Sequence, residues 1–284
     1  MEEYGIILAN IKFAGENNMR LYFAYVLLIL TILITGCGQQ SDELHKQSVF
    51  QYKNSTLELT KKVKTLSIKV DSANLQIYCW DNPEIKYEIK HTVRDKKSDE
   101  QLEKLLEKFS IETNVKDNVC TIIVNYNGKI KNTQDILSQI KLTIPRRIKS
   151  MIITQEQGIF TVEDKYEGNI NAELNSVNSE IKSMCGVLVL KCKNGNARLN
   201  SGELSNGSEV NVETGNIYIK AQCKDMSKYL FKTDTGNVDL TFPVASNIKL
   251  DLFGTITNNQ FTGMDGSIDI IASTNIGKIS VDGY

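Results

Sequence analysis

The chain has 284 residues, a mass of 31.9 kDa and a formal net charge of −1, with 41% hydrophobic and 24% charged residues. Its length allows one large domain or two small ones, and its composition is that of an ordinary folded domain. The near-zero net charge excludes a global electrostatic attraction to nucleic acid or to an anionic membrane surface, so no nucleic-acid partner is expected.

The N-terminal region carries a targeting signal. Residues 21–35 form a charge-free apolar run that follows Arg20. Such a run is short for a membrane span but fits the hydrophobic core of a signal peptide. The segment Ile34-Thr35-Gly36-Cys37 resembles the bacterial lipobox, in which small residues precede a cysteine that receives a lipid. An uncleaved membrane anchor with an incidental cysteine is the alternative.

The lipobox resemblance implies that residues 1–36 are a lipoprotein signal peptide, with Met19 a better start than Met1. It makes Cys37 the lipidation site, and it places the protein outside the cytoplasm, anchored to the cell membrane. The residues read by the signal peptidase would be Ile34, Thr35 and Gly36. Residues 37–56 are polar and without a sustained period, so we expect a flexible tether there.

Residues 57–150 are predicted to be a β-rich N-terminal region. Apolar residues alternate with polar ones in several short segments, as in half-buried strands. One amphipathic helix is expected near 98–110, where leucines recur at helical spacing. Pro145, followed by Arg146 and Arg147, indicates a break in direction and a boundary near 145–150.

Residues 151–284 repeat with a period of roughly twenty residues, with a strand about every ten. ETGNIYIK (213–220) and DTGNVDLTF (234–242) show the repeat most clearly. One such unit cannot bury its own apolar face, whereas copies stacked in register can. The pattern predicts a parallel β-solenoid; an antiparallel sandwich is the competing fold.

The repeat also predicts which residues turn and which are buried. Glycine followed by asparagine suits corners, because both residues tolerate positive φ, and successive asparagines could form a ladder along the stack. The structural turns expected are Gly168, Gly195, Gly215 and Gly236. Three buried columns are expected: Ile170, Leu190, Val210 and Phe231; Ala172, Cys192, Val212 and Thr233; and Ile181, Ala197, Ile217, Val238, Ile256 and Ile279.

The stretch from Leu142-Thr143-Ile144-Pro145 into these repeats resembles a bacterial "putative adhesin" family, a domain-of-unknown-function group of parallel β-solenoids. The small-glycine pairs Thr214-Gly215 and Thr235-Gly236 also match. The resemblance covers about residues 57–284. It implies the fold and suggests adhesion or envelope-stress roles, and it supplies no catalytic residues.

Signals for chemistry are sparse. The chain has two histidines, of which His45 lies in the tether and His91 is expected at a partly exposed strand end. Neither can form a catalytic pair inside the solenoid, and no phosphate-binding glycine loop or Cys-x-x-Cys motif is present. No catalytic residue, metal site or cofactor is therefore predicted. The acids of the solenoid are scattered, and Asp239 is expected on an outward face.

The six cysteines do not suggest a disulfide framework, because removing Cys37 leaves an odd number. Cys185 and Cys192 should point to opposite faces, and Cys192 suits a buried position.

These observations favour a non-catalytic, adhesin-like or envelope-sensing interaction module of the cell envelope with an unknown surface ligand. The alternative is a glycan-active β-helix enzyme, a polysaccharide lyase or glycoside hydrolase. The last coil, ending at Val281-Asp282-Gly283-Tyr284, has no polar cap, so self-association through this C-terminal coil is also expected.

Overall fold

In a computed structural model, the described residues are 47–95, 97–128, 135–224, 226–262 and 266–284. They belong to one compact unit. The signal peptide and Cys37 lie outside the described residues. Among the described residues, no helix is both long enough and apolar enough to cross a membrane.

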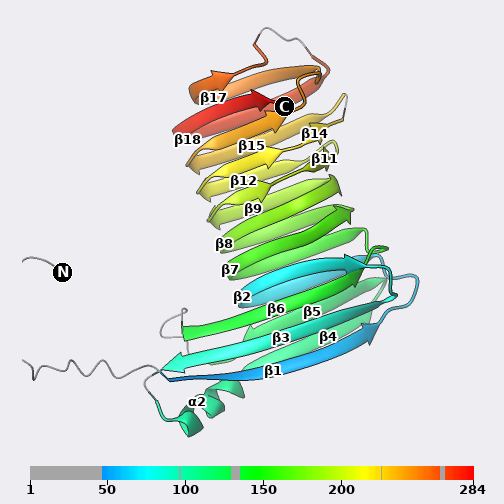
Figure 1. The fold of residues 1–284 in the computed structure, drawn as a ribbon, viewed down its shortest axis with the longest axis vertical. Helices are drawn as coiled ribbons and strands as arrows, with labels where there is room; N and C mark the ends of the chain where they lie inside the picture. The colour runs from blue at the N-terminus through cyan, green and yellow to red at the C-terminus, as the bar shows by residue number, and fades with distance from the viewer. Residues whose placement is uncertain (1–46, 96, 129–134, 225, 263–265) are drawn as a thin grey trace, which may run out of the picture. The chain divides into compact units, whose positions relative to one another are not determined.

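The described chain is all-β with one helix, so the expected fold class is confirmed at that level (Figure 1). The strands of the N-terminal part are β1 (Gln47–Glu58), β2 (Thr65–Trp80), β3 (Glu84–Asp95), β4 (Phe109–Lys116), β5 (Val119–Tyr126) and β6 (Ile136–Pro145). The helix is α2 (Asp99–Leu106), within the range expected from the sequence. Two long strands follow, β7 (Ser150–Glu167) and β8 (Asn169–Gly186).

Shorter strands continue the chain, because glycine corners and short loops divide the later repeats. They are β9 (Leu188–Asn194), β10 (Ala197–Leu199), β11 (Gly202–Leu204), β12 (Glu209–Thr214), β13 (Ile217–Lys220), β14 (Gln222–Cys223), β15 (Lys228–Thr235) and β16 (Val238–Phe242). The last two strands are long again, β17 (Ile248–Asn259) and β18 (Ile268–Gly283).

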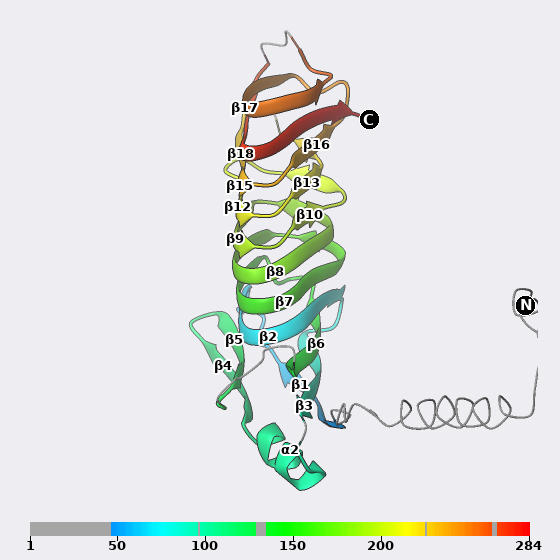
Figure 2. The same ribbon diagram turned by 90° about the vertical axis from the view of Figure 1, so that its left-hand side faces the viewer.

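Successive coils of the chain stack in parallel. On one side, called the back face, β8, β9, β12, β15 and β18 pair in that order. On the other side, the front face, β8, β10, β13, β16 and β18 pair in the same way. A short third side is formed by β8, β11 and β14. Figure 2 shows the back and front strands on opposite sides of the column.

The stack begins earlier than the sequence predicts. β2 pairs in parallel with β7 along both faces, from Thr65 with Ser150 to Ile77 with Val162. The expected boundary near residue 150 therefore falls between two strands of one continuous stack. The expected tether over 37–56 is also too long, because β1 begins at Gln47 and pairs along its length with β3. Every position of β1 is exposed or half-buried, so its apolar residues show only a weak period of two. The sequence therefore indicated a tether instead of a strand.

The N-terminal end is built differently from the rest. β3 pairs antiparallel with β1 and β6, and β4 pairs antiparallel with β5, which widens both faces. The buried face of α2 closes the lower end through Leu102 and Leu106, which pack in a cluster with Val93, Phe109, Tyr126 and Ile136. Arg147 holds the bend after β6 by donating from Nη2 to the carbonyls of Leu59 and Pro83, each at 2.8 Å.

The buried columns match the prediction in the middle of the stack and differ at both ends, where Ile256, expected to be buried, is 49% exposed. Leu190, Val210 and Phe231 share one column. The residue below Leu190, however, is Ala172 rather than Ile170. Likewise Ala197 lies above Ser179, and Ile181 lies below Leu199. The interval between these coils is 18 residues on both faces, whereas the expected columns used 20 on the back face and 16 on the front face, so each is shifted by two residues.

The order of the last coils also differs from the prediction. β18 pairs with β15 and β16 on one edge and with β17 on the other. The chain passes over one coil position to form β17 and then returns to fill it, as Figure 1 shows at the top of the column. The C-terminal coil is therefore enclosed, and the expected free edge at Val281 is wrong. The strand at the end of the stack is β17.

Candidate binding surface

The predicted corner glycines include three aligned corners of the stack. Gly195, Gly215 and Gly236 have φ of 141°, 141° and 146°, a region that L side chains rarely adopt. A Cβ on Gly215 would lie 1.9 Å from the carbonyl oxygen of Gly195, and one on Gly236 would lie 1.9 Å from that of Gly215. Gly168 has no such φ; a Cβ there would lie 2.5 Å from the carbonyl oxygen of Lys149. Close approach of the chains is thus the shared reason for glycine.

The asparagines after these glycines form the expected ladder. Asn196 donates from its backbone N and from Nδ2 to Oδ1 of Asn178, at 2.9 and 3.0 Å. Asn216 repeats both bonds to Asn196, at 2.9 and 3.1 Å. The backbone N of Asn237 then donates to Asn216 Oδ1 at 2.8 Å. The ladder ties each corner to the one below it, so its role is structural.

Side chains inside the same corners bond to backbone carbonyls. The hydroxyls of Thr233 and Thr274 donate to the carbonyls of Gly215 and Gly236, each at 2.8 Å. Cys192 Sγ donates to the Val177 carbonyl at 3.4 Å, in addition to the buried packing expected of it. All five described cysteines are free thiols, and burial raises the pKa of Cys79 to about 11.

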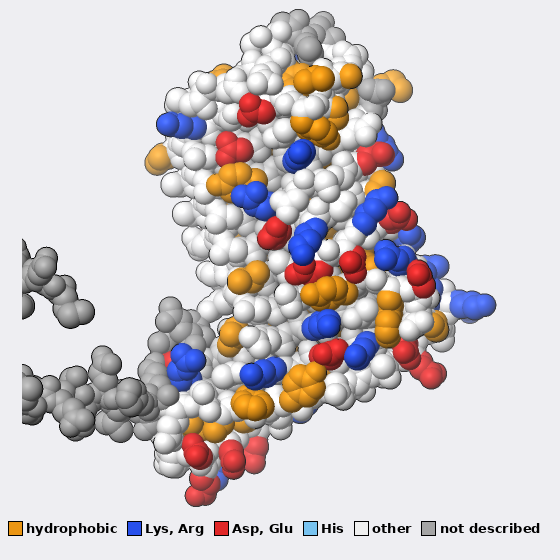
Figure 3. Space-filling view, viewed as in Figure 1, with side chains coloured by type: hydrophobic (Ala, Val, Ile, Leu, Met, Phe, Trp, Pro, Cys, Tyr) orange, Lys and Arg blue, Asp and Glu red, His pale blue; other side chains and the backbone are white. Residues whose placement is uncertain are grey.

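The front face presents aligned rows of side chains along the whole stack. Because the front strands pair in register over most of their length, outward positions line up from coil to coil; the register shifts after Val162 in β7 and between Ile256 and Asn258 in β17. One row runs through Lys141, Gln76, Thr161, Glu180, Arg198, Tyr218, Asp239, Ser280 and Asn258. Figure 3 shows hydrophobic, basic and acidic side chains interspersed on this face.

Four aromatic rings on the front face each lie under a cation. The distances from the cation to the ring centroid are 4.5 Å for Lys90 over Phe50, 5.1 Å for Lys141 over Tyr78, 4.3 Å for Arg198 over Tyr218 and 4.7 Å for Lys220 over Tyr284. The four pairs come from both ends and from the middle of the stack. Strand pairing brings them together, since their members are 20 to 64 residues apart in sequence.

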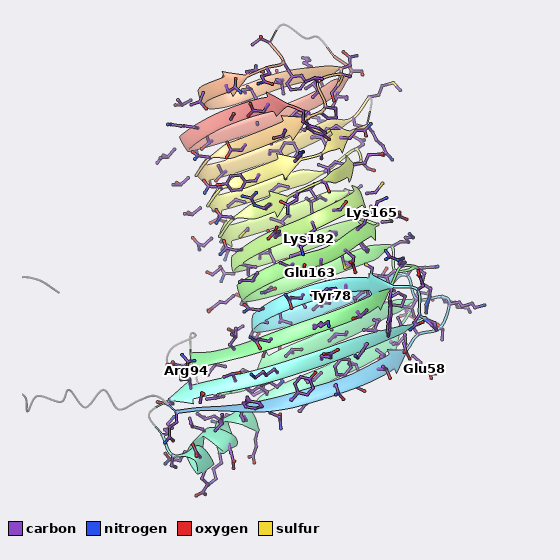
Figure 4. The ribbon with its side chains drawn as sticks, viewed as in Figure 1. Glu58, Tyr78, Arg94, Glu163, Lys165 and Lys182 are labelled. Atoms are coloured by element: carbon purple, nitrogen blue, oxygen red, sulfur yellow. The ribbon has the colours of Figure 1, made fainter. Side chains whose placement is uncertain are left out.

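Acids on the same face are held by neighbours. Glu163 forms an ion pair with Lys182, and that hydrogen bond raises the pKa of Lys182. Lys86 and Tyr52 both donate to Glu88, and these bonds lower the pKa of Glu88. Figure 4 labels Tyr78 beside Glu163 and Lys182 on the neighbouring coils.

Asp239 differs from the other acids on the front face. Burial, followed by the nearby charge of Asp282, raises the pKa of its carboxyl. Asp282 accepts a hydrogen bond from Ser280 Oγ at 2.8 Å and is also bonded to Asn258. The outward position expected for Asp239 is confirmed, and it adjoins Tyr218 in the row.

The back face carries a shallow groove with a volume of about 370 Å³. Its rim is charged, with both signs close together, and includes Glu156, Glu173, Lys191, Lys193 and Glu213. Within the described residues, no group of three or more His, Cys, Asp or Glu is arranged to hold a metal ion. The groove has no aromatic ring along it, and this distinguishes it from the front face.

His91 does not lie at an exposed strand end, as the sequence predicted. It is fully buried, stacks on Phe109 at a centroid distance of 4.0 Å, and shares a hydrogen bond of 2.9 Å between Nδ1 and Ser138 Oγ. Burial lowers the pKa of the imidazole to about 4. The prediction failed because the residues that enclose the ring, Phe109 in β4 and Ser138 in β6, lie 18 and 47 residues away in sequence.

Sequence reasoning missed the ring–cation pairs. The alternation of apolar and polar residues indicates which side chains point outward. Which outward side chains become neighbours depends on the register between coils, which alternation does not specify.

No protein-family model and no curated protein sequence matches the chain. Solved structures match it at low identity. A "putative cell adhesion protein" from Clostridium sporogenes is 13% identical, with a TM-score of 0.36, covering 82% of this chain and 100% of that one. A "putative adhesin" from Bacteroides fragilis is 12% identical, with a TM-score of 0.37, covering 81% and 97%. A "putative lipid binding protein" from Parabacteroides distasonis is 14% identical, with a TM-score of 0.34, covering 81% and 96%. Likeness at this level carries no functional argument.

Proposed function

We propose that this protein is a surface binding module whose stacked coils, a β-solenoid, hold an extended anionic polysaccharide along the front face. The observation that carries the proposal is the set of four ring–cation pairs on that face. A flat sheet with coils about 4.8 Å apart suits a long polymer better than a small molecule.

The chemistry of the pairs favours an acidic sugar chain. Aromatic rings offer apolar area with little loss of side-chain freedom, and Phe50 and Tyr284 stay 63% and 51% exposed beside their cations, so sugar rings can pack against them. The cations lie against rings, whereas Lys86 and Lys182 lie against carboxylates. Lys90 and Lys220 can offer their charge to a ligand carboxylate or phosphate, and so can Lys141 and Arg198, which also lie near the carboxyls of Glu88 and Asp239.

Binding can be tested with purified protein and matched acidic and neutral polysaccharides. We expect the acidic polymer to bind with an affinity that falls as salt rises, and the neutral polymer to bind weakly. Replacing Arg198 and Tyr218 together by alanine should weaken binding roughly tenfold or more, since paired anchors contribute a few kcal/mol. Lys191→Ala on the back face is the control. Equal losses in both variants would contradict the proposal.

We also propose that the protein is a lipoprotein held outside the cytoplasm by lipid on Cys37. The lipobox resemblance of Ile34-Thr35-Gly36-Cys37 supports this anchor. Cells fed a labelled fatty acid should label the wild-type protein and not the Cys37→Ala variant. An unlabelled wild type, or label that persists in the variant, would exclude the anchor.

A catalytic role is the second candidate, and Asp239 is the observation that favours it. A carboxyl with a raised pKa beside a second carboxylate is the arrangement that glycosidases use. We propose binding without cleavage as the principal function. Incubation with the polymer that binds should leave its chain length unchanged; cleavage that disappears in Asp239→Asn would make the protein an enzyme.

A further inference from the structure

The end of the stack is an edge strand. β17 pairs in parallel with β18, and no other strand pairs with it among the described residues. An edge strand offers a row of unpaired backbone N–H and C=O groups to another strand. Figure 1 shows β17 at the top of the column.

The apolar core reaches the surface at this edge. Ile256 is 49% exposed, although its column neighbours Ile279 and Val238 are fully buried. Phe253, on the outward side of β17, is 61% exposed. Leu250 and Leu252 are only partly buried against the core. Ile248 is fully buried, but the last coil leaves Leu250, Leu252 and Ile256 incompletely buried at inward positions, which the inner coils bury.

The charges on β17 indicate which strand would cover it. Lys249 and Asp251 are exposed and lie two residues apart, on either side of Leu250. If two β17 strands paired antiparallel about Leu250, Lys249 of each copy would lie opposite Asp251 of the other. The same pairing would set Ile248 opposite Leu252 on the inward side.

This pairing would also continue a pattern already present in the stack. Lys228, Asp269 and Lys249 lie in one outward column, with alternating charge from β15 to β17. Asp251 of a second copy would take the next position in that column. Because the contact has two-fold symmetry, it closes after two copies.

We propose that two copies of this chain associate end to end through antiparallel pairing of their β17 strands, centred on Leu250. The dimer would extend each front face into a doubled one while leaving the ring–cation pairs exposed. It does not depend on polysaccharide binding.

Sedimentation equilibrium of the full chain in detergent tests the dimer. We expect the protein mass to approach twice the monomer value as concentration rises and to stop there. A carbodiimide, which joins an amine to a carboxylate in contact with it, should link Lys249 of one copy to Asp251 of the other. A monomer at all concentrations, or mass that grows beyond two copies, would overturn the proposal.

Charge reversal tests the register. Lys249→Glu should raise the dissociation constant on the order of tenfold, because it places like charges opposite each other twice. The double variant Lys249→Asp with Asp251→Lys should restore association. Lys232→Glu, the same change on the inner strand β15, is the matched control and should leave association unchanged. Failure of the double variant to recover, or an equal effect of the control, would rule out this pairing.

Discussion

Glycine and asparagine act as a unit at the corner where the back face turns into the front face. Glycine lets one coil approach the next, since a side chain on Gly215 or Gly236 would overlap the carbonyl oxygen of the coil below. The asparagine that follows then bonds to the asparagine of the neighbouring corner. The sequence pair Gly-Asn thus specifies both the bend and the attachment of the bend to the stack.

Gly236→Ala should destabilise the fold by about 2–4 kcal/mol, because the new Cβ has neither space nor an allowed φ. Gly207→Ala is the control: its φ is +83°, but no atom lies within 4 Å of the added Cβ. We expect a cost of about 1 kcal/mol there, from backbone strain alone. Urea denaturation of both variants measures the difference; equal costs would mean that close contact at the corner is unimportant.

His91 should make stability depend on pH. Its pKa is about 4 in the folded protein and 6.5 when exposed, so the unfolded chain binds the proton more readily. The contribution of His91 is therefore fully present above pH 6.5 and is lost as pH falls toward 4, by about 3 kcal/mol at most.

Unfolding free energies of wild type and His91→Phe, compared at several pH values, isolate this contribution. Phenylalanine keeps the stacking on Phe109 but does not titrate in this range. The difference between the two proteins should shift in favour of the variant as pH falls from 6.5 to 4. A difference that does not change with pH would show that His91 is not buried in its neutral form.

At the scale of elements, the sequence predicts which residues of a strand point inward better than it predicts which residues of the next coil they pair with. The Gly-Asn repeats gave the correct middle columns, such as Ala197, Ile217 and Val238, because the interval there is constant at about twenty residues. The long strand β8, which has no glycine at its corner near Asn178, was misaligned by two residues with the coil that follows it. Alternation has a period of two, so a shift by two leaves the inward pattern unchanged and cannot be detected from it.

For the front face, the sequence likewise predicts which side chains point outward but not which of them are in contact, because contact depends on the register. Tyr218 and Arg198 can each be recognised as outward from alternation alone. Their contact depends on the register between β10 and β13, which the corner glycines fix. The contact between Lys90 and Phe50 depends on β1, where the sequence predicted a tether.

The asparagine ladder should contribute measurably to stacking. Asn216→Ala removes the acceptor of the Asn237 backbone N–H and leaves that partly buried group without its side-chain partner. We expect a loss of about 1–3 kcal/mol in the free energy of unfolding. Asn175 is half-buried, and its Nδ2 donates to Glu156 at 3.0 Å in an exposed hydrogen bond, so Asn175→Ala should cost less than about 0.5 kcal/mol. If the two variants lose equal stability in denaturation, the ladder has no special role.

At the scale of the whole molecule, the order of the coils in space departs from their order in the chain. The ladder shows the change directly: Asn237 accepts from the backbone N of Lys278, 41 residues later, where earlier steps span about twenty. The apolar pattern of the two last strands is consistent with their places. β18 is buried at Ile268, Ile270, Ala272, Ile279 and Val281, whereas the second half of β17 is largely polar and exposed.

This order predicts a particular pattern of hydrogen exchange. Amides of β18 are enclosed between β16 and β17, so peptides covering 268–283 should exchange slowly although they end the chain. Peptides covering β17 (248–259) should exchange faster, because one edge of that strand is open and its opening disturbs only one neighbour. A chain stacked in sequence order would show the reverse, with 268–283 as the fraying edge.

Pairing of two β17 strands would slow exchange in 248–252 as protein concentration rises. Exchange measured at low and high concentration therefore separates the order of the coils from their association.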